Sequence, residues 1–162
     1  MAKPNDTDKH GDWPVRRSPE PGVHTSSFGP TMVFLTVATK DRRPWLAADE
    51  PHAVLRAVWR EATAWVVGRY VLMPDHLHLF ASPGEPVLEI EDWIRYWKRL
   101  FTQRISYSPG RWQSKGWHHR LRQDESYAEK WDYVRHNPVR HGLVRDPGDW
   151  PYQGELHVLR TC

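Results

Sequence analysis

The sequence contains 162 residues, of which 39% are hydrophobic, and its mean hydropathy is -0.76; these values fit one globular domain with a single core. It has no apolar run of about 18 residues and no basic segment followed by an apolar one, so it predicts neither a membrane span nor a secretion signal. Cys162 is the one cysteine, which excludes an intrachain disulfide and favours a reducing cytoplasm.

Positive charge is concentrated in one part of the chain, although the formal net charge is only +3. Residues 1–94 carry 10 Lys and Arg against 13 Asp and Glu, whereas residues 95–145 carry 12 against 4. A balance of +8 in the second segment favours a polyanionic partner whose affinity falls with salt. A solvated basic face is the alternative explanation of the same charges.

The first elements are read from composition and apolar spacing. Pro, Gly, Ser, Asp and Lys dominate residues 1–29, where we predict a disordered or loosely packed lead-in. The β-branched and aromatic run at 32–37 predicts a buried strand. Apolar residues then recur at helical spacing over 54–62, shortly after Pro51, and predict the first helix.

A hairpin, a second helix and a short strand are expected next. The turn signal at 73–75 separates strand-like segments at 65–72 and 76–80, which predicts a hairpin. An apolar stripe from residue 90 to residue 105 predicts the second helix. Alternating polarity over 117–122 is consistent with a further short strand.

The last helix is predicted to begin at Ser126, with Glu129 completing a capping box, and to end at Pro138. Its expected buried face consists of Tyr127, Trp131 and Val134.

The order strand–helix–strand–strand–helix–strand predicts an α+β fold, a ferredoxin-like sandwich in which an antiparallel sheet carries helices on one face. The last helix follows it and is expected to be catalytic. We place the domain at residues 30–152 and expect a C-terminal tail at 153–162.

Two histidines in the second strand of the hairpin carry the first chemical signal. Because alternate side chains of a strand point to the same face, His76 and His78 should project together while Leu77 turns into the core. Two neutral imidazoles placed in this way can share one divalent ion. The alternative is a half-exposed strand whose histidines bind nothing.

A tyrosine and an amide on the last helix complete the candidate site. Tyr133 and Asn137 are four residues apart, which is about 40° of rotation and about 6 Å of rise, so both side chains point away from the buried face. Taken singly, Asn137 is explained as a helix cap before Pro138, and Tyr133 as a half-buried amphipathic residue.

Taken together, these four residues predict a phosphoryl-transfer site. Two imidazoles and an amide oxygen can hold Mg²⁺ or Mn²⁺ with positions open for a phosphate oxygen and water. A phenolic oxygen beside such an ion can attack phosphorus in line.

Two segments resemble a known family. Residues 70–78 (YVLMPDHLH) are similar to the strand that carries the HUH motif (His, hydrophobic residue, His) of single-tyrosine transposases of short insertion sequences. Residues 132–144 (DYVRHNPVRHGLV) resemble the segment that bears their nucleophile. Trp112-Gln113 and residues 119–122 (HRLR) point to the branch of REP-associated tyrosine transposases. The resemblance runs from about residue 30 to about residue 152.

The resemblance implies that Tyr133 is the nucleophile and that His76, His78 and Asn137 bind the divalent metal ion, Mg²⁺ or Mn²⁺. It implies cleavage of single-stranded DNA beside a folded hairpin, which leaves a 5′-phosphotyrosine and a free 3′-OH, followed by strand joining. It implies a monomer or homodimer that binds hairpin DNA and does not bind a membrane. The expected location is the cytoplasm, and the nucleoid when the protein is bound to DNA.

The sequence departs from the family pattern in two places. Trp117-His118-His119 stands where the family commonly carries an aromatic residue followed by an acid. The lead-in at 1–29 is unlike a palindrome-reading arm.

Eight basic side chains are predicted to contact DNA phosphates, with simple solvation as the alternative for each: Arg95, Lys98, Arg99, Arg104, Arg120, Arg122, Arg135 and Arg140. Trp112 is expected either to stack on a base or to fill the core, and His119 to support either the site or the fold.

Two other functions compete with the transposase hypothesis. A captured transposase would keep the basic surface and bind hairpins without cutting them. A small zinc hydrolase would need a carboxylate to activate water, but strand alternation predicts that Asp75 points away from the face of His76.

Overall fold

The computed structural model describes residues 31–122 and 126–160, so the predicted lead-in at 1–29 and Cys162 lie outside the described residues. The strands are β1 (Val33–Ala38), β2 (Trp65–Leu72), β3 (His76–Pro83), β4 (Trp117–Arg120) and β5 (Gln153–Glu155). The helices are η1 (Lys40–Arg42), α1 (Asp49–Glu61), α2 (Ile90–Arg104), α3 (Tyr127–Arg135), α4 (Asn137–Arg140) and η2 (Pro147–Asp149). Apart from the short turn η1, the elements through β4 follow the predicted order, and the α+β class is confirmed.

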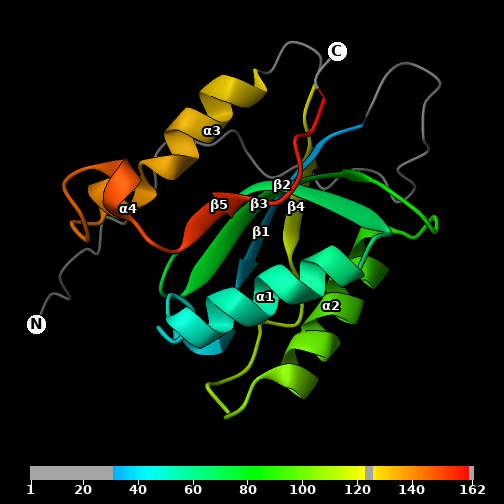
Figure 1. Cartoon of the computed structure of the whole chain (residues 1–162), viewed down its shortest axis with the longest axis horizontal. Coiled ribbons are helices and arrows are strands. Elements are labelled where there is room, and N and C mark those ends of the chain that lie inside the picture. The colour runs from blue at the N-terminus through cyan, green and yellow to red at the C-terminus, as the bar shows by residue number, and fades with distance from the viewer. Residues whose placement is uncertain (1–30, 123–125, 161–162) are drawn as a thin grey trace, which may run out of the picture.

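All neighbouring strands of the sheet are antiparallel, and their order is β4-β1-β3-β2-β5. The interior position of β1 in the sheet explains why its segment reads as an apolar run in the sequence. Helices α1 and α2 lie on one side of this sheet, while α3 and α4 lie on the other side (Figure 1). The prediction that the first two helices share one face is therefore confirmed.

The larger core fills the space between the sheet and helices α1 and α2. Helix α2 has apolar side chains at helical spacing, and these bury one continuous stripe. Its buried residues are Ile90, Trp93, Ile94, Trp97 and Phe101. A smaller cluster on the opposite face joins Phe34 and Phe80 of the sheet to Val134 of α3. None of the helices in the described part of the chain is both long enough and apolar enough to cross a membrane.

Part of the expected C-terminal tail belongs to the sheet. Residues Gln153–Glu155 form β5, which pairs with β2 at the edge. The pairing of β2 with β3 shifts register between Val67 and Tyr70, around Gly68. A Cβ atom on Gly68 would lie 2.6 Å from the Leu159 side chain, so glycine allows the C-terminal segment to pack over β2. No local sequence signal indicates this strand, because Gln-Gly-Glu has little strand propensity and pairs through its backbone.

Pro138 divides the last helical stretch instead of ending it. Helix α3 ends at Arg135, and α4 then carries Pro138 in its first turn. Proline fits there because the first turn of a helix does not use its missing N–H group. The stretch ends at Gly142, with a φ of 69°, whose N–H donates to the Val139 carbonyl (3.0 Å). The Leu143 N–H donates to the Pro138 carbonyl (2.8 Å), which completes a Schellman motif.

Candidate active site

The two histidines occupy the central strand β3 on the face opposite α1 and α2. Their ring centroids are 4.8 Å apart and the ring planes cross at 79°. Leu77, between them, is fully buried in the larger core. The sequence therefore placed this pair correctly on one face of the sheet.

Each imidazole is oriented through its Nδ1 atom. His76 Nδ1 lies 2.7 Å from Asp75 Oδ1, and because a carboxylate only accepts, the Nδ1–H group of His76 is the donor. His78 Nδ1 lies 2.8 Å from the hydroxyl of Thr36, its cross-strand partner on β1. Both contacts occupy Nδ1 and leave Nε2 as the nitrogen that a metal ion would use, as is usual for metal-binding histidines; for His78 this requires the tautomer in which Nδ1–H donates to the Thr36 hydroxyl.

Asp75 does not point away from His76, contrary to the sequence prediction. It lies in the turn before β3, so the alternation of side chains along a strand does not govern it. Its second oxygen accepts from Arg42 Nε at 2.8 Å. The hydrogen bond from His76, followed by the positive charges of His76 and Arg42, outweighs burial and lowers the pKa of Asp75 to about 2. A carboxylate that is ionised and engaged in this way is a weak base, which argues against the hydrolase alternative.

His78 is held in its neutral form. Burial, and then the positive charges of His76, Arg42 and Arg140, keep its pKa well below the ordinary value. A neutral imidazole is the form that binds a metal ion. Arg140 of α4 is the smallest of these contributions.

Arg140 joins the tyrosine to the amide. Its guanidinium carbon lies 4.0 Å from the ring centroid of Tyr133, a cation–π contact. The Nη2 atom donates to Asn137 Oδ1 and to the Tyr133 carbonyl oxygen, both at 2.6 Å. The Tyr133 side chain is 45% exposed, as its place off the buried face predicted. Tyr133 and Asn137 therefore meet at Arg140, although they belong to two helices instead of one.

The donor set fits a divalent ion that is bound by few protein ligands. His78 presents a neutral imidazole, His76 donates from Nδ1 and so turns its Nε2 away from Asp75, and the amide oxygen of Asn137 keeps a second lone pair beside the Arg140 contact. Within residues 31–122 and 126–160, no group of three or more His, Cys, Asp or Glu is arranged to hold a metal ion. The remaining positions would then belong to water and phosphate oxygens.

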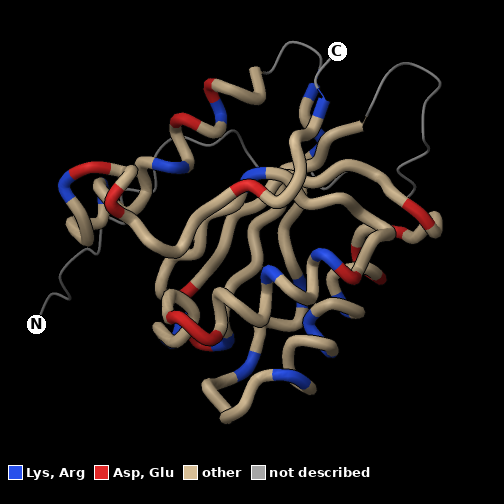
Figure 2. The backbone as a smooth tube through the Cα atoms, viewed as in Figure 1, with Lys and Arg blue, Asp and Glu red and all other residues tan. Residues whose placement is uncertain are grey.

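The predicted DNA-contacting cations do not form one patch. Lys and Arg residues follow α2 on the α1/α2 side of the sheet, while others lie on α3 and α4 (Figure 2). Helix α2 carries Arg95, Lys98, Arg99 and Arg104. Arg120 ends β4 and Arg122 follows it, whereas Arg135 and Arg140 end α3 and α4. The +8 balance of residues 95–145 is thus divided between the two faces.

Several of these cations have carboxylate partners within the chain. Arg104 makes two hydrogen bonds to Glu61 of α1, at 2.5 and 2.7 Å. Arg95 pairs with Asp92 at 2.7 Å and Arg135 with Asp132 at 3.2 Å. Arg104, whose pair crosses between two helices, is consequently the weakest of the eight candidates for a phosphate contact.

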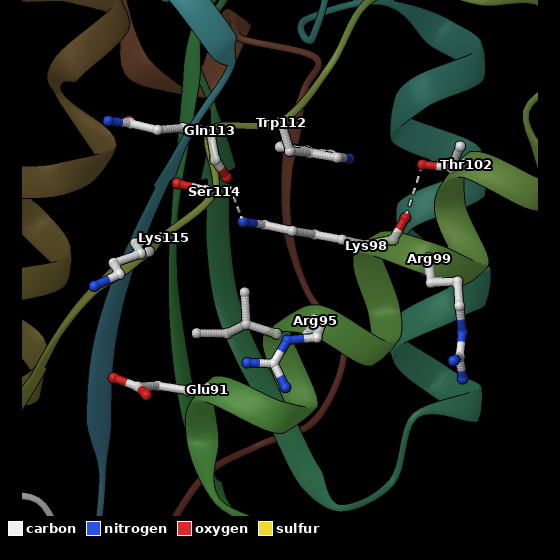
Figure 3. A pocket seen from close by; sticks show the side chains of 11 residues that line it. Glu91, Arg95, Lys98, Arg99, Thr102, Trp112, Gln113, Ser114 and Lys115 are labelled. Atoms are coloured by element: carbon white, nitrogen blue, oxygen red, sulfur yellow. Dashed lines mark hydrogen bonds between the residues drawn. The ribbon is translucent and has the colours of Figure 1, made fainter.

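A cavity of about 320 Å³ lies between α2 and residues 112–116. The Lys98 side chain crosses it to donate to the Gln113 carbonyl oxygen at 2.8 Å (Figure 3). Burial lowers the pKa of Lys98 to about 8. The Trp112 ring lies 5.4 Å from Trp97 and 5.3 Å from Phe101, so the structure places Trp112 in the aromatic core cluster.

The sequence did not identify three residues of the site: Thr36, Arg42 and the orienting carboxylate of Asp75. Their roles depend on strand register and on a turn. Thr36 reaches His78 across β1 and β3, and Arg42 reaches Asp75 from η1, where it has a φ of 54°. No local pattern marks these three residues, because strand register and turn geometry are set by distant parts of the chain.

The fold has an antiparallel sheet with a His-x-His pair on a central strand. A helix that bears a tyrosine lies over the same face of the sheet. This arrangement matches the transposase fold that the sequence resembles. No family model matches the chain. A solved REP-associated tyrosine transposase bound to a REP hairpin superposes with a TM-score of 0.64 and 27% identity, over 75% of this chain and 74% of that one.

Two curated proteins are similar in sequence. A REP-associated tyrosine transposase of Escherichia coli K12 is 28% identical over 123 residues, which cover 74% of this chain and 73% of that protein. A Haemophilus influenzae protein that carries the same family name is 33% identical over 94 residues, which cover 50% of this chain and about half (53%) of that protein. REP-associated tyrosine transposases are therefore homologues of this chain, and the resemblance is confirmed.

Proposed function

We propose that this protein cuts single-stranded DNA beside a hairpin and joins it again through a covalent bond to Tyr133. The observation that carries the proposal is the pair of Nδ1-oriented histidines on the sheet face that also holds Tyr133, Asn137 and Arg140. Homology to REP-associated tyrosine transposases supports the reaction type, and the relative bound to a REP hairpin supports a hairpin substrate.

In the proposed reaction, the phenolic oxygen of Tyr133 attacks the scissile phosphorus and the bond from phosphorus to the 3′ oxygen breaks. The phenolic proton passes to solvent, and the departing strand leaves with a 3′-OH. Because the phosphotyrosine retains the energy of the broken phosphodiester, a second 3′-OH can attack it, restore the DNA and release Tyr133. No nucleotide cofactor is needed.

His76, His78 and Asn137 would hold Mg²⁺ or Mn²⁺. When bound, the ion supplies charge stabilisation for the phosphate and the departing 3′ oxygen. Arg140 adds a fixed positive charge beside the Tyr133 ring, where it stabilises the phenolate that forms when the phenolic proton is lost. Asp75 and Thr36 keep the two imidazoles in the orientation that presents Nε2.

The decisive experiment compares Tyr133→Phe with the native protein on labelled single-stranded hairpin DNA and Mn²⁺. We expect a protein–DNA band on a denaturing gel with the native protein and none with the variant, while hairpin binding by gel shift is retained. Tyr107→Phe is the matched control because Tyr107 is also exposed (47%) and lies after α2. A covalent band in Tyr133→Phe would refute the assignment of the nucleophile.

A second candidate is a module that binds hairpins without cutting them. The contact from Arg140 to Asn137 Oδ1 favours it, because this contact occupies part of the oxygen proposed as the third ligand. Hairpin binding by the native protein, with no covalent band in Mg²⁺ or Mn²⁺, would support this candidate over the cleaving enzyme.

A further inference from the structure

Trp117 differs from the other tryptophans in its exposure. It is 39% exposed, while every other tryptophan among the described residues is buried or half-buried. It opens β4, an edge strand of the sheet. A large aromatic ring kept at the surface of an edge strand loses much of its hydrophobic stabilisation, so packing alone does not account for it.

The strand register places Trp117 on the face of the proposed active site. Trp117 is the cross-strand partner of Thr36, and Thr36 is in turn the partner of His78. The ring of Phe34 lies between them, 6.2 Å from the ring of Trp117 and 5.3 Å from that of His78. Since neighbouring strands are about 4.8 Å apart, Trp117 lies about 10 Å across the sheet from His78.

A second ring and a positive charge accompany Trp117 there. The rings of His119 and Trp117 are 6.0 Å apart and nearly parallel, with an angle of 11° between their planes. The Lys130 ammonium of α3 lies 5.2 Å from the Phe34 ring. Parallel aromatic planes next to a positive charge are the features with which proteins bind unpaired bases and the adjoining phosphates.

We propose that Trp117, supported by His119, stacks on one unpaired base of the DNA strand near the phosphate that is cut. This inference rests on the proposed function and names a base-binding position within it. A separation of about 10 Å is on the order of three nucleotides of a stacked strand, with a rise of about 3.4 Å each. The bound base therefore lies within about three nucleotides of the scissile phosphate.

The test combines Trp117→Leu with a series of DNA strands that lack one base. Leucine keeps an apolar side chain on β4 but has no aromatic plane. Each of the four nucleotides on either side of the cleavage site is made abasic in turn, and binding and covalent-complex formation are measured for every strand. Tyr107→Leu, at an exposed aromatic residue after α2, is the matched control, and Trp117→Phe is the conservative variant.

We expect Trp117→Leu to bind the intact strand roughly 5- to 100-fold more weakly, and Trp117→Phe and Tyr107→Leu to bind it nearly as the native protein does. One abasic position should weaken binding by the native protein and have little further effect in Trp117→Leu. That non-additivity identifies the stacked base, and a merely structural role of Trp117 would not produce it.

Three results would overturn the inference. The first is native-like binding of the intact strand by Trp117→Leu. The second is that, at every position, the loss of binding caused by the abasic nucleotide adds to the loss caused by Trp117→Leu. The third is that none of the eight abasic positions weakens binding by the native protein. In each of them the native protein still forms the covalent complex with the intact strand, so the proposed function stands. If the native protein neither binds nor cuts the hairpin strand, the proposed function fails and this inference fails with it.

Discussion

The two faces of the sheet are built from the same strands but carry opposite kinds of side chain. On β1, Leu35 and Val37 turn toward α1 and α2, whereas Phe34 and Thr36 turn toward the face of α3. On β3, Leu77 and Leu79 contribute to the larger core, whereas His76 and His78 project from the other side. The period of two along each strand thus separates a wholly apolar face from one that combines apolar and polar side chains.

We infer from this separation that one face stabilises the fold and the other binds and reacts with the substrate. The α1/α2 face buries large aromatic rings, including Trp59, Trp93 and Trp97, and supplies most of the hydrophobic stabilisation. The opposite face has a smaller apolar cluster and holds the histidines, Tyr133 and Trp117. Substitutions on the first face should therefore change the free energy of unfolding, and substitutions on the second should change binding and chemistry.

The largest expected effect is on stability, in Trp97→Ala. Trp97 is fully buried, with its ring within 5.4 to 6.2 Å of those of Trp59, Trp93 and Trp112. Removing the ring should lower the free energy of unfolding by about 3–5 kcal/mol, measured by urea denaturation.

Trp117→Ala is the control for that experiment, since it removes the same side chain from the other face. Because Trp117 is exposed, its loss should change stability by only about 0.5 kcal/mol. If both variants were equally destabilised, the division of tasks between the faces would be wrong.

A smaller effect is expected from Thr36→Val, which removes the hydroxyl beside His78 Nδ1 while keeping the shape of the side chain. Loss of a group that orients a metal-binding histidine typically weakens metal affinity about 10- to 100-fold. Mn²⁺ binding, measured by calorimetry, should weaken by that factor, and the Mn²⁺ concentration needed for covalent-complex formation should rise with it.

Thr102→Val provides the comparison on the other side of the molecule, because the Thr102 hydroxyl donates to the Lys98 carbonyl within α2. Its Mn²⁺ affinity should equal that of the native protein. An undiminished affinity in Thr36→Val would mean that the histidines bind no metal through the orientation described above.

Local patterns in the sequence were sufficient for most of the fold. The apolar spacing of α2, the Met73-Pro74-Asp75 turn and the capping box at Ser126 each act within a few residues, and the corresponding elements are confirmed. Strand alternation also located the common face of His76 and His78, because a period of two requires no knowledge of neighbouring strands.

Features that depend on distant parts of the chain were not predictable in the same way. The strand β5 forms only because β2 offers an unpaired edge. The orientation of Asp75 depends on a turn and on Arg42, which is 33 residues away. The division of the basic residues 95–145 between two faces follows from the packing of α2 and α3 on opposite sides of the sheet, which no charge count along the sequence contains.

The smallest expected effect concerns the salt dependence of DNA binding, and it tests whether the active-site face alone contacts the strand. Arg140 lies beside Tyr133 and Asn137, so we expect its guanidinium to contact a phosphate. Arg140→Ala should then reduce the slope of the logarithm of the binding constant against the logarithm of salt concentration by about one unit. Arg104→Ala removes an equal charge, but Arg104 is held by Glu61 on the other face. The slope measured for Arg104→Ala should therefore match that of the native protein.

Both slopes can be obtained by titrating a labelled hairpin from low to high salt. Equal changes in the two variants would mean that only the overall charge matters, whereas a change confined to Arg104→Ala would place the DNA on the α1/α2 face.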